Sequence, residues 1–455
     1  PEVFNGSNSG FDTIVGNPPW EEATMEEKEF WSRYVPGLQG RSQSEFEQIK
    51  SKKREERPDL VEKYERELEE GKRRAEIIKN GPFPGAASGG SAPDTYKAFN
   101  WRFRQLLRKG GYAGIVLPRS AFSGAGSEKF RRNLLNKGVV EDLTFLVNKN
   151  KWVFSEIHPQ YTIALLGYRN IQPGDDATLP LRGPFSDKKS YEKGVSGDPV
   201  RFDTENALGW TEKASFPTFP KDTSSVEAFR QMNEYPSLSA DVGDWTTNPC
   251  TQLNSGTEKA KDDGTQLIHF IDDPPENYWP VMKGSSFDIW NPETGDVYGW
   301  GDPDVMTDYL QEKRENSYKY AGSRSPFSEI PESRVHDKSK LPCYRPRVAF
   351  RDISRRTDSR TVRTALIPPN VFVVDTGPFL LFPRGDERDE SYVLGVMSSI
   401  PFDWYSRRFV ETHLNFHVLN ALPIPRPGRK SQLRQRVMKI SGRLAAIDER
   451  YAEWA

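Results

Sequence analysis

The residues with the clearest chemical meaning form a short loop, Asn17-Pro18-Pro19-Trp20, directly after the apolar run Phe11–Gly16. Two successive prolines remove backbone N–H donors, so the run predicts a β-strand that ends at this loop. The side-chain oxygen of Asn17 and the carbonyl oxygen of Pro18 are two hydrogen-bond acceptors. The ring of Trp20 adds a flat apolar face beside them. Such a loop suits a planar ligand that carries an amino group with two hydrogens.

This pair of acceptors has a specific use on an amino group attached to an aromatic ring. The exocyclic nitrogen of adenine is a poor nucleophile because its lone pair is delocalised into the ring. Acceptors placed on both of its hydrogens favour a tetrahedral nitrogen, while the ring of an extruded base can stack on Trp20. The alternative is a strand that merely ends at prolines, and the preceding Phe-Asp-Thr-Ile-Val-Gly makes this the weaker interpretation.

A family resemblance begins at the same residues. Phe11–Trp20 resembles the catalytic motif of adenine-N6 DNA methyltransferases that use S-adenosylmethionine. It is most similar to the large type IIG-like enzymes and their relatives in the BREX and DISARM phage-defence systems. The similarity continues through Asp94–Gly111, Gly114–Phe122 and Trp152–Leu166. It implies that Phe154 packs on the flipped base together with Trp20, whereas an ordinary core position is the equal alternative for Phe154.

Alternating strand and helix patterns through residue 170 predict an α/β domain with a mostly parallel sheet. Its clearest strands are predicted at 11–16, 112–117, 139–147 and 161–168. The charged stretch 21–80 predicts an inserted helical hairpin whose second helix begins at Pro58. The resemblance implies that residues 1–170 form the catalytic half of a Rossmann-like methyltransferase fold.

The character of the chain changes after residue 170. Residues 171–430 are richer in Gly, Pro, Asp and Ser, with short aromatic strands, and residues 431–455 have the apolar spacing of an amphipathic helix. The resemblance implies a mixed α/β, strand-rich target-recognition domain over 171–430. We expect the chain to close with a C-terminal helix over 431–455.

The resemblance also implies S-adenosylmethionine as the cofactor. The family's cofactor-binding half precedes the catalytic motif, but only ten residues precede Phe11. We therefore expect an upstream segment or a partner chain to supply that half, with Gly16 and Asn17 as candidate cofactor contacts in this chain. A permuted alternative is Phe122-Ser-Gly-Ala-Gly126, which follows a predicted strand and opens a helix, with Glu141 downstream.

A second set of candidate residues lies in segment 344–363, which has seven arginines against two aspartates in a chain of net charge -1. Interleaved arginines and aromatic rings suit phosphates and base edges, and a solvated sheet edge with salt bridges is the alternative. The segment resembles the family's target-recognition domain, and the similarity extends to Asn415, for which helix capping is the alternative role. The predicted contacts to double-stranded DNA are Arg345, Arg347, Arg351, Arg355, Arg356, Arg360 and Asn415.

Composition narrows the remaining classes of protein. Cys250 and Cys343 are the only cysteines, which excludes a disulfide framework and a cysteine-built zinc site and fits a reducing cytosol. We expect a cytoplasmic protein with no metal site and no membrane span. The spacing of Pro58-Asp59 and Glu70-Gly71-Lys72 matches a PD-ExK nuclease, but it lies in a charged helical stretch where such a match arises easily by chance.

These observations together predict a site-specific DNA adenine-N6 methyltransferase that flips its target base. The family context is restriction–modification or phage defence, where subunits of a defence system are further expected partners. One alternative is an enzyme of the same fold that methylates RNA or a protein glutamine, because the lone pair of the glutamine amide nitrogen is also delocalised. The other is a non-catalytic subunit that recognises DNA for a partner chain.

Overall fold

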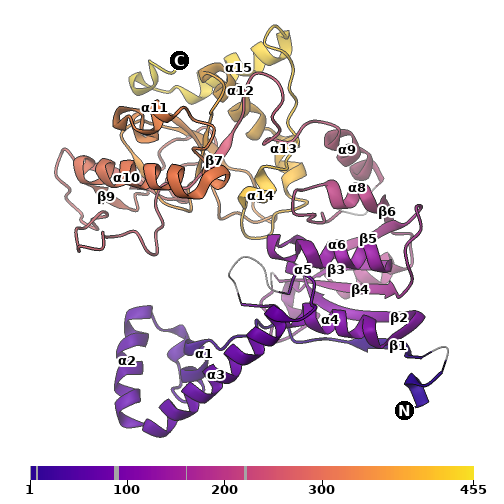
Figure 1. Ribbon diagram of the computed structural model, residues 1–455. Coiled ribbons are helices and arrows are strands. Elements are labelled where there is room, and N and C mark those ends of the chain that lie inside the picture. Colours follow the sequence, from indigo (N-terminus) through magenta and orange to yellow (C-terminus); the bar gives the residue numbers. More distant parts are fainter. Residues whose placement is uncertain (1, 7–8, 87–91, 160, 220–222) are drawn as a thin grey trace. The chain divides into compact units, whose positions relative to one another are not determined.

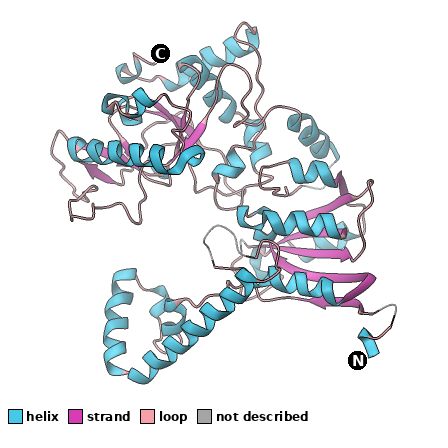
Figure 2. Ribbon diagram, in the orientation of Figure 1, coloured by secondary structure: helices cyan, strands magenta, loops and turns pink. Residues whose placement is uncertain are grey.

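The computed structural model shows two compact units, Pro1–Ser225 and Val226–Ala455 (Figure 1). Both units combine helices with strands, as the predicted α/β class requires (Figure 2). Within the described ranges, no helix has the length and apolar character needed to cross a bilayer. The residues that the structure describes are 2–6, 9–86, 92–159, 161–219 and 223–455.

The first unit is built on a six-stranded sheet with the strand order β1-β2-β4-β3-β5-β6. The pairs β1–β2 and β3–β5 are parallel, and the other three pairs are antiparallel. Four strands therefore run in one direction, with β4 and β6 running against them, which confirms the expected predominance of one direction. The strands are β1 (Phe11–Gly16), β2 (Leu107–Pro118), β3 (Val139–Val147), β4 (Thr162–Arg169), β5 (Thr178–Phe185) and β6 (Val200–Asp203).

The first unit extends further along the chain than its composition indicates. Strands β5 and β6 join the same sheet after residue 170, and the unit ends at Ser225. The boundary expected after residue 170 therefore lies inside this unit. Residues 171–177 are a turn-containing connection into β5, so their Gly and Pro mark a loop within the unit rather than a linker.

Short helices follow the strands of this sheet, and the segment between β1 and α4 forms a helical hairpin with a small core of its own. That core buries Phe30, Trp31, Phe46 and Leu60. Helix α3 begins at Pro58, as predicted, because a first-turn residue needs no N–H donor. The helices are α1 (Glu27–Ser32), α2 (Gln43–Glu56), α3 (Pro58–Asn80), α4 (Thr95–Leu106), α5 (Ser120–Ser123), α6 (Glu128–Lys137), α7 (Lys188–Val195) and α8 (Thr204–Gly209).

The second unit contains two smaller sheets, with strand orders β11-β10-β13-β7 and β12-β8-β9. Two clusters of buried apolar side chains hold these sheets together, one around Phe287 and Val373 and one around Val281 and Leu253. The strands are β7 (Asn248–Cys250), β8 (Trp279–Met282), β9 (Gly299–Gly301), β10 (Arg347–Phe350), β11 (Thr364–Ile367), β12 (Phe372–Val373) and β13 (Phe379–Leu381).

Helices surround these two sheets, and the last helix packs closely on α12. The two helices approach closely at Gly395 of α12, where an added Cβ would overlap the side chains of Ser441 and Val437 in α15. The helices are α9 (Thr223–Asn233), α10 (Pro303–Ala321), α11 (Glu332–Val335), α12 (Glu387–Met397), α13 (Ile400–Ser406), α14 (Phe416–Leu419) and α15 (Gln432–Ala445).

The closing helix is shorter than expected over 431–455. Helix α15 ends at Ala445, and a 3-10 turn follows at Glu449–Tyr451. Tyr451 and Trp454 are buried, and the hydroxyl of Tyr451 donates to the carbonyl oxygen of Leu366 at 3.1 Å. The last residues thus pack into the second unit instead of continuing an exposed helix.

Candidate functional site

The Asn17–Trp20 loop leaves the sheet at the carboxyl end of β1. Asn17 and Pro19 are exposed, Pro18 is buried, and Trp20 is half-buried. Among the described residues, nothing donates a hydrogen bond to the side chain of Asn17 or to the carbonyl oxygen of Pro18. Neither of the two acceptors that the sequence singles out is therefore used by another group of the described structure.

Hydrogen bonds from two neighbouring elements fix the other end of this loop. The hydroxyl of Thr95, at the start of α4, donates to the carbonyl oxygens of Pro19 and Glu21 at 2.8 and 2.7 Å. The indole N–H of Trp20 donates to the carbonyl oxygen of Val116 on β2 at 3.3 Å. The loop is thus held by α4 and β2, which leaves its Asn17 end open.

An open pocket of about 350 Å³ lies between this loop and the loop that follows β3. The rings of Trp20 and Phe154 meet there edge to face, with centroids 6.0 Å apart and an interplanar angle of 89°. Strands β1 and β3 run in the same direction, so both loops lie at the same edge of the sheet, where α/β folds commonly bind ligands. The pocket lining is Asn17, Pro18, Pro19, Trp20, Phe154, Ser155, Glu156 and Ile157.

Asn148 is a site residue that the sequence reasoning missed. It follows β3 directly, is fully buried, and holds the loop that carries Phe154. Its Oδ1 accepts hydrogen bonds from the backbone N–H groups of Val153 (3.1 Å) and Phe154 (3.0 Å). Its Nδ2 donates to the carbonyl oxygens of Phe154 (2.8 Å) and Ile157 (2.9 Å). An asparagine between a predicted strand and an irregular loop is the signal that indicates such backbone bonding.

The pocket is nearly uncharged. Glu156 is the one charged side chain in its described lining, and it is exposed. The rest offers ring faces, prolines and the free oxygens of Asn17 and Pro18. In the described part of the chain, no three His, Cys, Asp or Glu side chains gather in a way that could hold a metal ion. This pocket can therefore bind and orient a flat, uncharged ring with an amino group.

The edge of the sheet beside this pocket is bare. Strand β1 stands at the end of the strand order and pairs only with β2 in the described sheet. Val15 on β1 is 81% exposed and Tyr112 on β2 is 46% exposed, although both are large apolar residues. Gly16 ends this strand next to Asn17.

The permuted glycine-rich turn is occupied by side chains of its own unit. Arg131 donates to the carbonyl oxygen of Gly124 at 2.8 Å, and Lys97 donates to that of Gly126 at 3.0 Å. Both cations are buried. They fill the space beside the turn, so the geometry does not favour Gly124–Gly126 as a cofactor site.

Several of the predicted DNA-contacting arginines are tied to their own unit. Arg347 is 4% exposed, and its guanidinium donates to the carbonyl oxygen of Val371 at 2.7 Å and covers the ring of Phe379. Arg345 pairs with Glu387 and Glu390 at 3.1 and 3.0 Å. Arg347 therefore belongs to the core of the second unit, whereas Arg345 forms partly exposed ion pairs within that unit.

Three further arginines are also engaged within the second unit. Arg351 donates to the carbonyl oxygen of Phe287 at 2.9 Å and lies 3.4 Å from Asp288. Arg360 pairs with Asp403 at 3.5 Å. Burial lowers the pKa of the Arg356 guanidinium, which is half-buried. The salt-bridge interpretation thus describes much of the arginine-rich segment.

Arg355 and Asn415 differ, since both are exposed and their side chains have no partner among the described residues. Asn415 begins α14, yet its side chain makes no capping bond. The two segments that carry them run side by side, joined by an antiparallel bridge between Ile353 and His413. Ile353 is 54% exposed. We call Ile353, Arg355, His413 and Asn415 the Arg355–Asn415 surface.

Comparisons with known proteins give structural likeness at low sequence identity. No protein-family model matches this chain, and no curated protein matches it. It is similar to the type IIL restriction–modification enzyme MmeI in complex with DNA (11% identity, TM-score 0.44, 97% of this chain and 50% of that one). It is also similar to the type IIG restriction endonuclease BpuSI (15% identity, TM-score 0.28, 81% of this chain and 46% of that one). A third similar structure is the type ISP restriction–modification enzyme LlaBIII bound to DNA (12% identity, TM-score 0.38, 96% of this chain and 29% of that one). The chain spans half or less of each.

Proposed function

We propose that this chain is the catalytic and DNA-recognising part of an adenine-N6 DNA methyltransferase that flips its target base, in a restriction–modification or phage-defence system. One observation carries the proposal. Asn17 and Pro18, whose side-chain and carbonyl oxygens have no partner among the described residues, line the same pocket as Trp20 and Phe154. A pocket with two free acceptors beside apolar rings matches the amino group and the flat ring of adenine.

In this proposal the residues of the pocket bind and orient the base. Trp20 and Phe154 contact its ring, while Asn17 Oδ1 and the Pro18 carbonyl oxygen each accept one hydrogen of the exocyclic amine. The nitrogen lone pair is then directed out of the ring plane and can attack. Bound S-adenosylmethionine supplies an electrophilic methyl group, and Gly16 and Asn17 are the residues here that would contact it. The amine needs no strong base, because it loses its proton after methyl transfer.

The cofactor-binding segment is proposed to pair with β1. A bare apolar strand at a sheet edge is a template for pairing, and soluble proteins normally cover such edges. A further strand at β1 and a helix over Val15 and Tyr112 would cover this one. The segment would come from the same polypeptide or from a partner chain, and it would lie next to Gly16 and Asn17.

The Arg355–Asn415 surface is proposed to contact double-stranded DNA. A free guanidinium on an exposed segment suits a phosphate, and a free amide suits a base edge. His413 lies between them, with its Nδ1 2.6 Å from the carboxylate of Asp352. The arginines already engaged with their own unit, Arg347 above all, are left out of this interface.

The test is a methyl-transfer assay on three substrate classes. The protein is purified with whatever segment or subunit accompanies it, and it is incubated with labelled S-adenosylmethionine and DNA, RNA or protein. We expect label in DNA as N6-methyladenine and none in the other two. Label in RNA or in protein glutamine would reassign the substrate. DNA binding without any transfer would leave the chain a recognition subunit.

A further inference from the structure

A short 3-10 turn, Lys149–Lys151, lies directly between β3 and the loop that carries Phe154. Its two lysines are exposed, and no hydrogen bond or ion pair engages either ammonium group among the described residues. The proposed methyl transfer uses the pocket next to this turn but assigns no role to these lysines. We call this segment the Lys149–Lys151 turn.

The backbone of the turn has a conformation that its residues rarely adopt. Asn150 and Lys151 have φ values of 55° and 58°, in the left-handed region that glycine enters without cost. Two hydrogen bonds hold it there: the N–H of Lys151 donates to the carbonyl oxygen of Asn148 at 2.8 Å, and the indole N–H of Trp152 donates to that of Val147 at 2.7 Å. Backbone strain of this kind is concentrated at ligand sites. A lysine in place of glycine here indicates a use for the side chain.

The turn lies at the same edge of the sheet as the Asn17–Trp20 loop. Strands β1, β3 and β5 run in one direction, so the segments that follow them meet at one edge, and α7 follows β5. One apolar cluster joins these segments and contains Trp20, Trp152, Phe154 and Tyr191 of α7. The rings of Trp152 and Tyr191 lie 6.2 Å apart. The turn is therefore held beside the pocket that is proposed to receive the base.

The charges around the turn leave a positive surplus. Helix α7 carries three exposed lysines and one glutamate, Glu192, which lies 3.8 Å from Lys188. Asp187 caps this helix by accepting a hydrogen bond from the N–H of Ser190 at 2.8 Å. Glu156 is the exposed acid of the pocket lining. A negatively charged ligand is thus favoured at the turn and disfavoured inside the pocket.

A nucleic-acid strand has this distribution of charge. A base that leaves the duplex stays joined through its sugar to one phosphate on each side. The pocket takes the uncharged base, and the phosphates stay outside it. The two lysines of the turn are compact point charges at its mouth, which suits contacts to phosphate oxygens.

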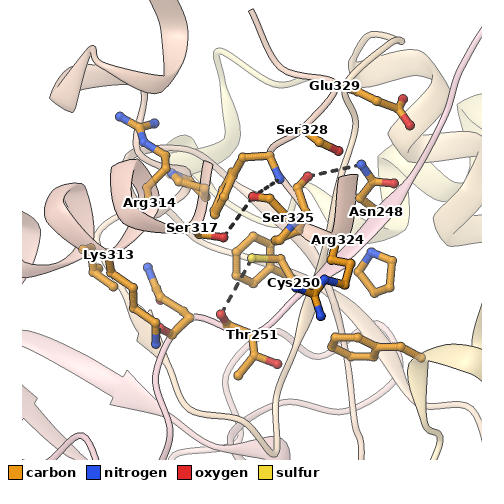
Figure 3. Close-up of a pocket in the computed structure, with 18 of the residues that line it drawn as sticks. Asn248, Cys250, Thr251, Lys313, Arg314, Ser317, Arg324, Ser325, Ser328 and Glu329 are labelled. Atoms are coloured by element: carbon orange, nitrogen blue, oxygen red, sulfur yellow. Dashed lines mark hydrogen bonds between the residues drawn. The ribbon is translucent and has the colours of Figure 1, made fainter. Parts of the chain in front are cut away.

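A cavity in the second unit, of about 470 Å³, shows a different arrangement of cations (Figure 3). Its Lys313 is paired with Glu258 at 2.6 Å, and its Arg314 is buried and donates to a backbone carbonyl oxygen at 3.1 Å. Arg324 is the exposed cation of that lining. The Lys149–Lys151 turn instead has two free ammonium groups beside a pocket with room for a base.

We propose that Lys149 and Lys151 bind the phosphates that flank the flipped nucleotide, which gives the first unit a DNA-backbone site of its own. This inference rests on the proposed function, because it takes the occupant of the pocket to be a base of DNA. The ammonium groups hold the strand at the mouth of the pocket, while Trp20 and Phe154 contact the base. Phosphates are the same at every position, so the site adds affinity for DNA of any sequence.

The test is DNA binding by the double variant Lys149→Gln with Lys151→Gln, purified with whatever segment or subunit accompanies the protein. Fluorescence anisotropy with a labelled duplex gives the affinity across a salt series. Loss of two phosphate contacts should make the slope of log binding constant against log salt concentration shallower by about two, and lower the affinity about tenfold at low salt. Neither lysine has a partner to lose among the described residues, so the thermal unfolding midpoint should stay unchanged.

The double variant Lys109→Gln with Lys137→Gln is the matched control, since it removes the same total charge. Lys109 lies near the start of β2, and Lys137 ends α6 just before β3, so both stand at the opposite edge of the sheet. Both are exposed. The control should keep the wild-type salt slope. Equal slopes in the two double variants would overturn the proposal.

Chemical acetylation of lysines, read by mass spectrometry, gives a second result that needs no methyl transfer. Bound DNA should protect Lys149 and Lys151, while Lys109 and Lys137 react as in the free protein. Protection without methylation of any substrate would support the phosphate site and refute the proposed chemistry. Methylation of DNA without protection, and with an unchanged salt slope, would overturn the phosphate site and leave the proposed function standing. Folded protein that binds no DNA would overturn both.

Discussion

The pocket beside β1 depends on two asparagines in opposite environments. Asn17 is exposed, and its side chain is free to meet a ligand. Asn148 is buried, and its amide is fully used by four bonds to the loop that carries Phe154. In the proposed function the first acts on the substrate, while the second positions the loop that carries Phe154. The two residues should respond very differently to substitution.

Asn148→Ala should destabilise the first unit and loosen the Phe154 loop. The change leaves two backbone N–H groups and two carbonyl oxygens without their partner, which costs about 2–3 kcal/mol of unfolding free energy. Methyl transfer should fall as well. Asn148→Asp keeps the oxygen that accepts from the two backbone N–H groups, so it should restore part of the stability and part of the activity. Chemical denaturation and the methylation assay measure the two effects.

Asn136→Ala is the matched control for that experiment, since Asn136 is exposed near the end of α6. It should leave both stability and activity close to those of the wild type. Wild-type stability in Asn148→Ala would show that the four hydrogen bonds do not hold the loop.

The sequence could single out residues that form a local motif, but it could not show which of its arginines are buried by tertiary structure. Asn17 and Trp20 belong to a motif that is complete within four residues. Arg347 and Arg355 look alike in the sequence, yet Arg347 lies on β10, which is paired on both sides, and Arg355 follows the end of that strand. Only the pairing of distant strands separates a buried guanidinium from an exposed one.

Among the elements, the short apolar strands were the most predictable. The predicted strands 11–16 and 139–147 coincide with β1 and β3, because continuous apolar runs ended by turn residues have one clear interpretation. Strand β2 starts earlier than expected, at Leu107. Gly110, at a φ of 78°, and Gly111 lie within that strand instead of separating it from α4. An added Cβ at Gly111 would come within 2.9 Å of the Phe11 carbonyl oxygen.

Helix α12 gives a prediction about pH. Burial raises the pKa of Glu390 to about 7, although Arg345 and the indole N–H of Trp454, at 2.7 Å, both favour its charged form. Between about pH 4.5 and 7 the folded state keeps a proton that the unfolded state has released, so stability falls as pH rises through this window. Glu390→Gln should remove that loss, about 1–3 kcal/mol, and flatten the pH dependence of the unfolding midpoint.

Glu387→Gln is the matched control for the pH experiment. Glu387 shares Arg345 with Glu390 at 3.1 Å but is partly exposed on the first turn of the same helix. Its replacement should leave the fall in stability between about pH 4.5 and 7 unchanged. If stability still fell with pH in Glu390→Gln, the carboxyl group of Glu390 would not be the group whose ionisation causes the fall.

At the scale of the whole molecule, the proposed function assigns separate tasks to the two units. The pocket of Asn17 and Phe154 belongs to the first unit, and the Arg355–Asn415 surface belongs to the second. The sequence analysis divided the chain at residues 170 and 430, because composition cannot show that β5 pairs with β3 and β6 with β5. Long-range strand pairing is what moves the division to residue 225.

Separable tasks predict that Arg355→Ala weakens DNA binding without altering the methylation pocket. DNA affinity falls as salt rises, and the slope of log binding constant against log salt concentration measures this dependence. Removal of one phosphate contact should make that slope shallower by about one. Fluorescence anisotropy across a salt series measures the slope. Arg388→Ala, at an exposed position of α12, should leave it unchanged. An unaltered slope in Arg355→Ala would remove this residue from the DNA interface.

The most direct test of the proposed methyl transfer is the effect of Asn17→Ala on two quantities in the same preparation, the rate of adenine methylation and the affinity for DNA. The rate should fall about 100-fold or more, since one acceptor on the reacting amine is lost, while affinity stays within about twofold of wild type. Asn80→Ala, at the exposed end of α3, is the control that should change neither. A methylation rate that survives Asn17→Ala, or an equal loss of rate and affinity, would contradict the role assigned to Asn17.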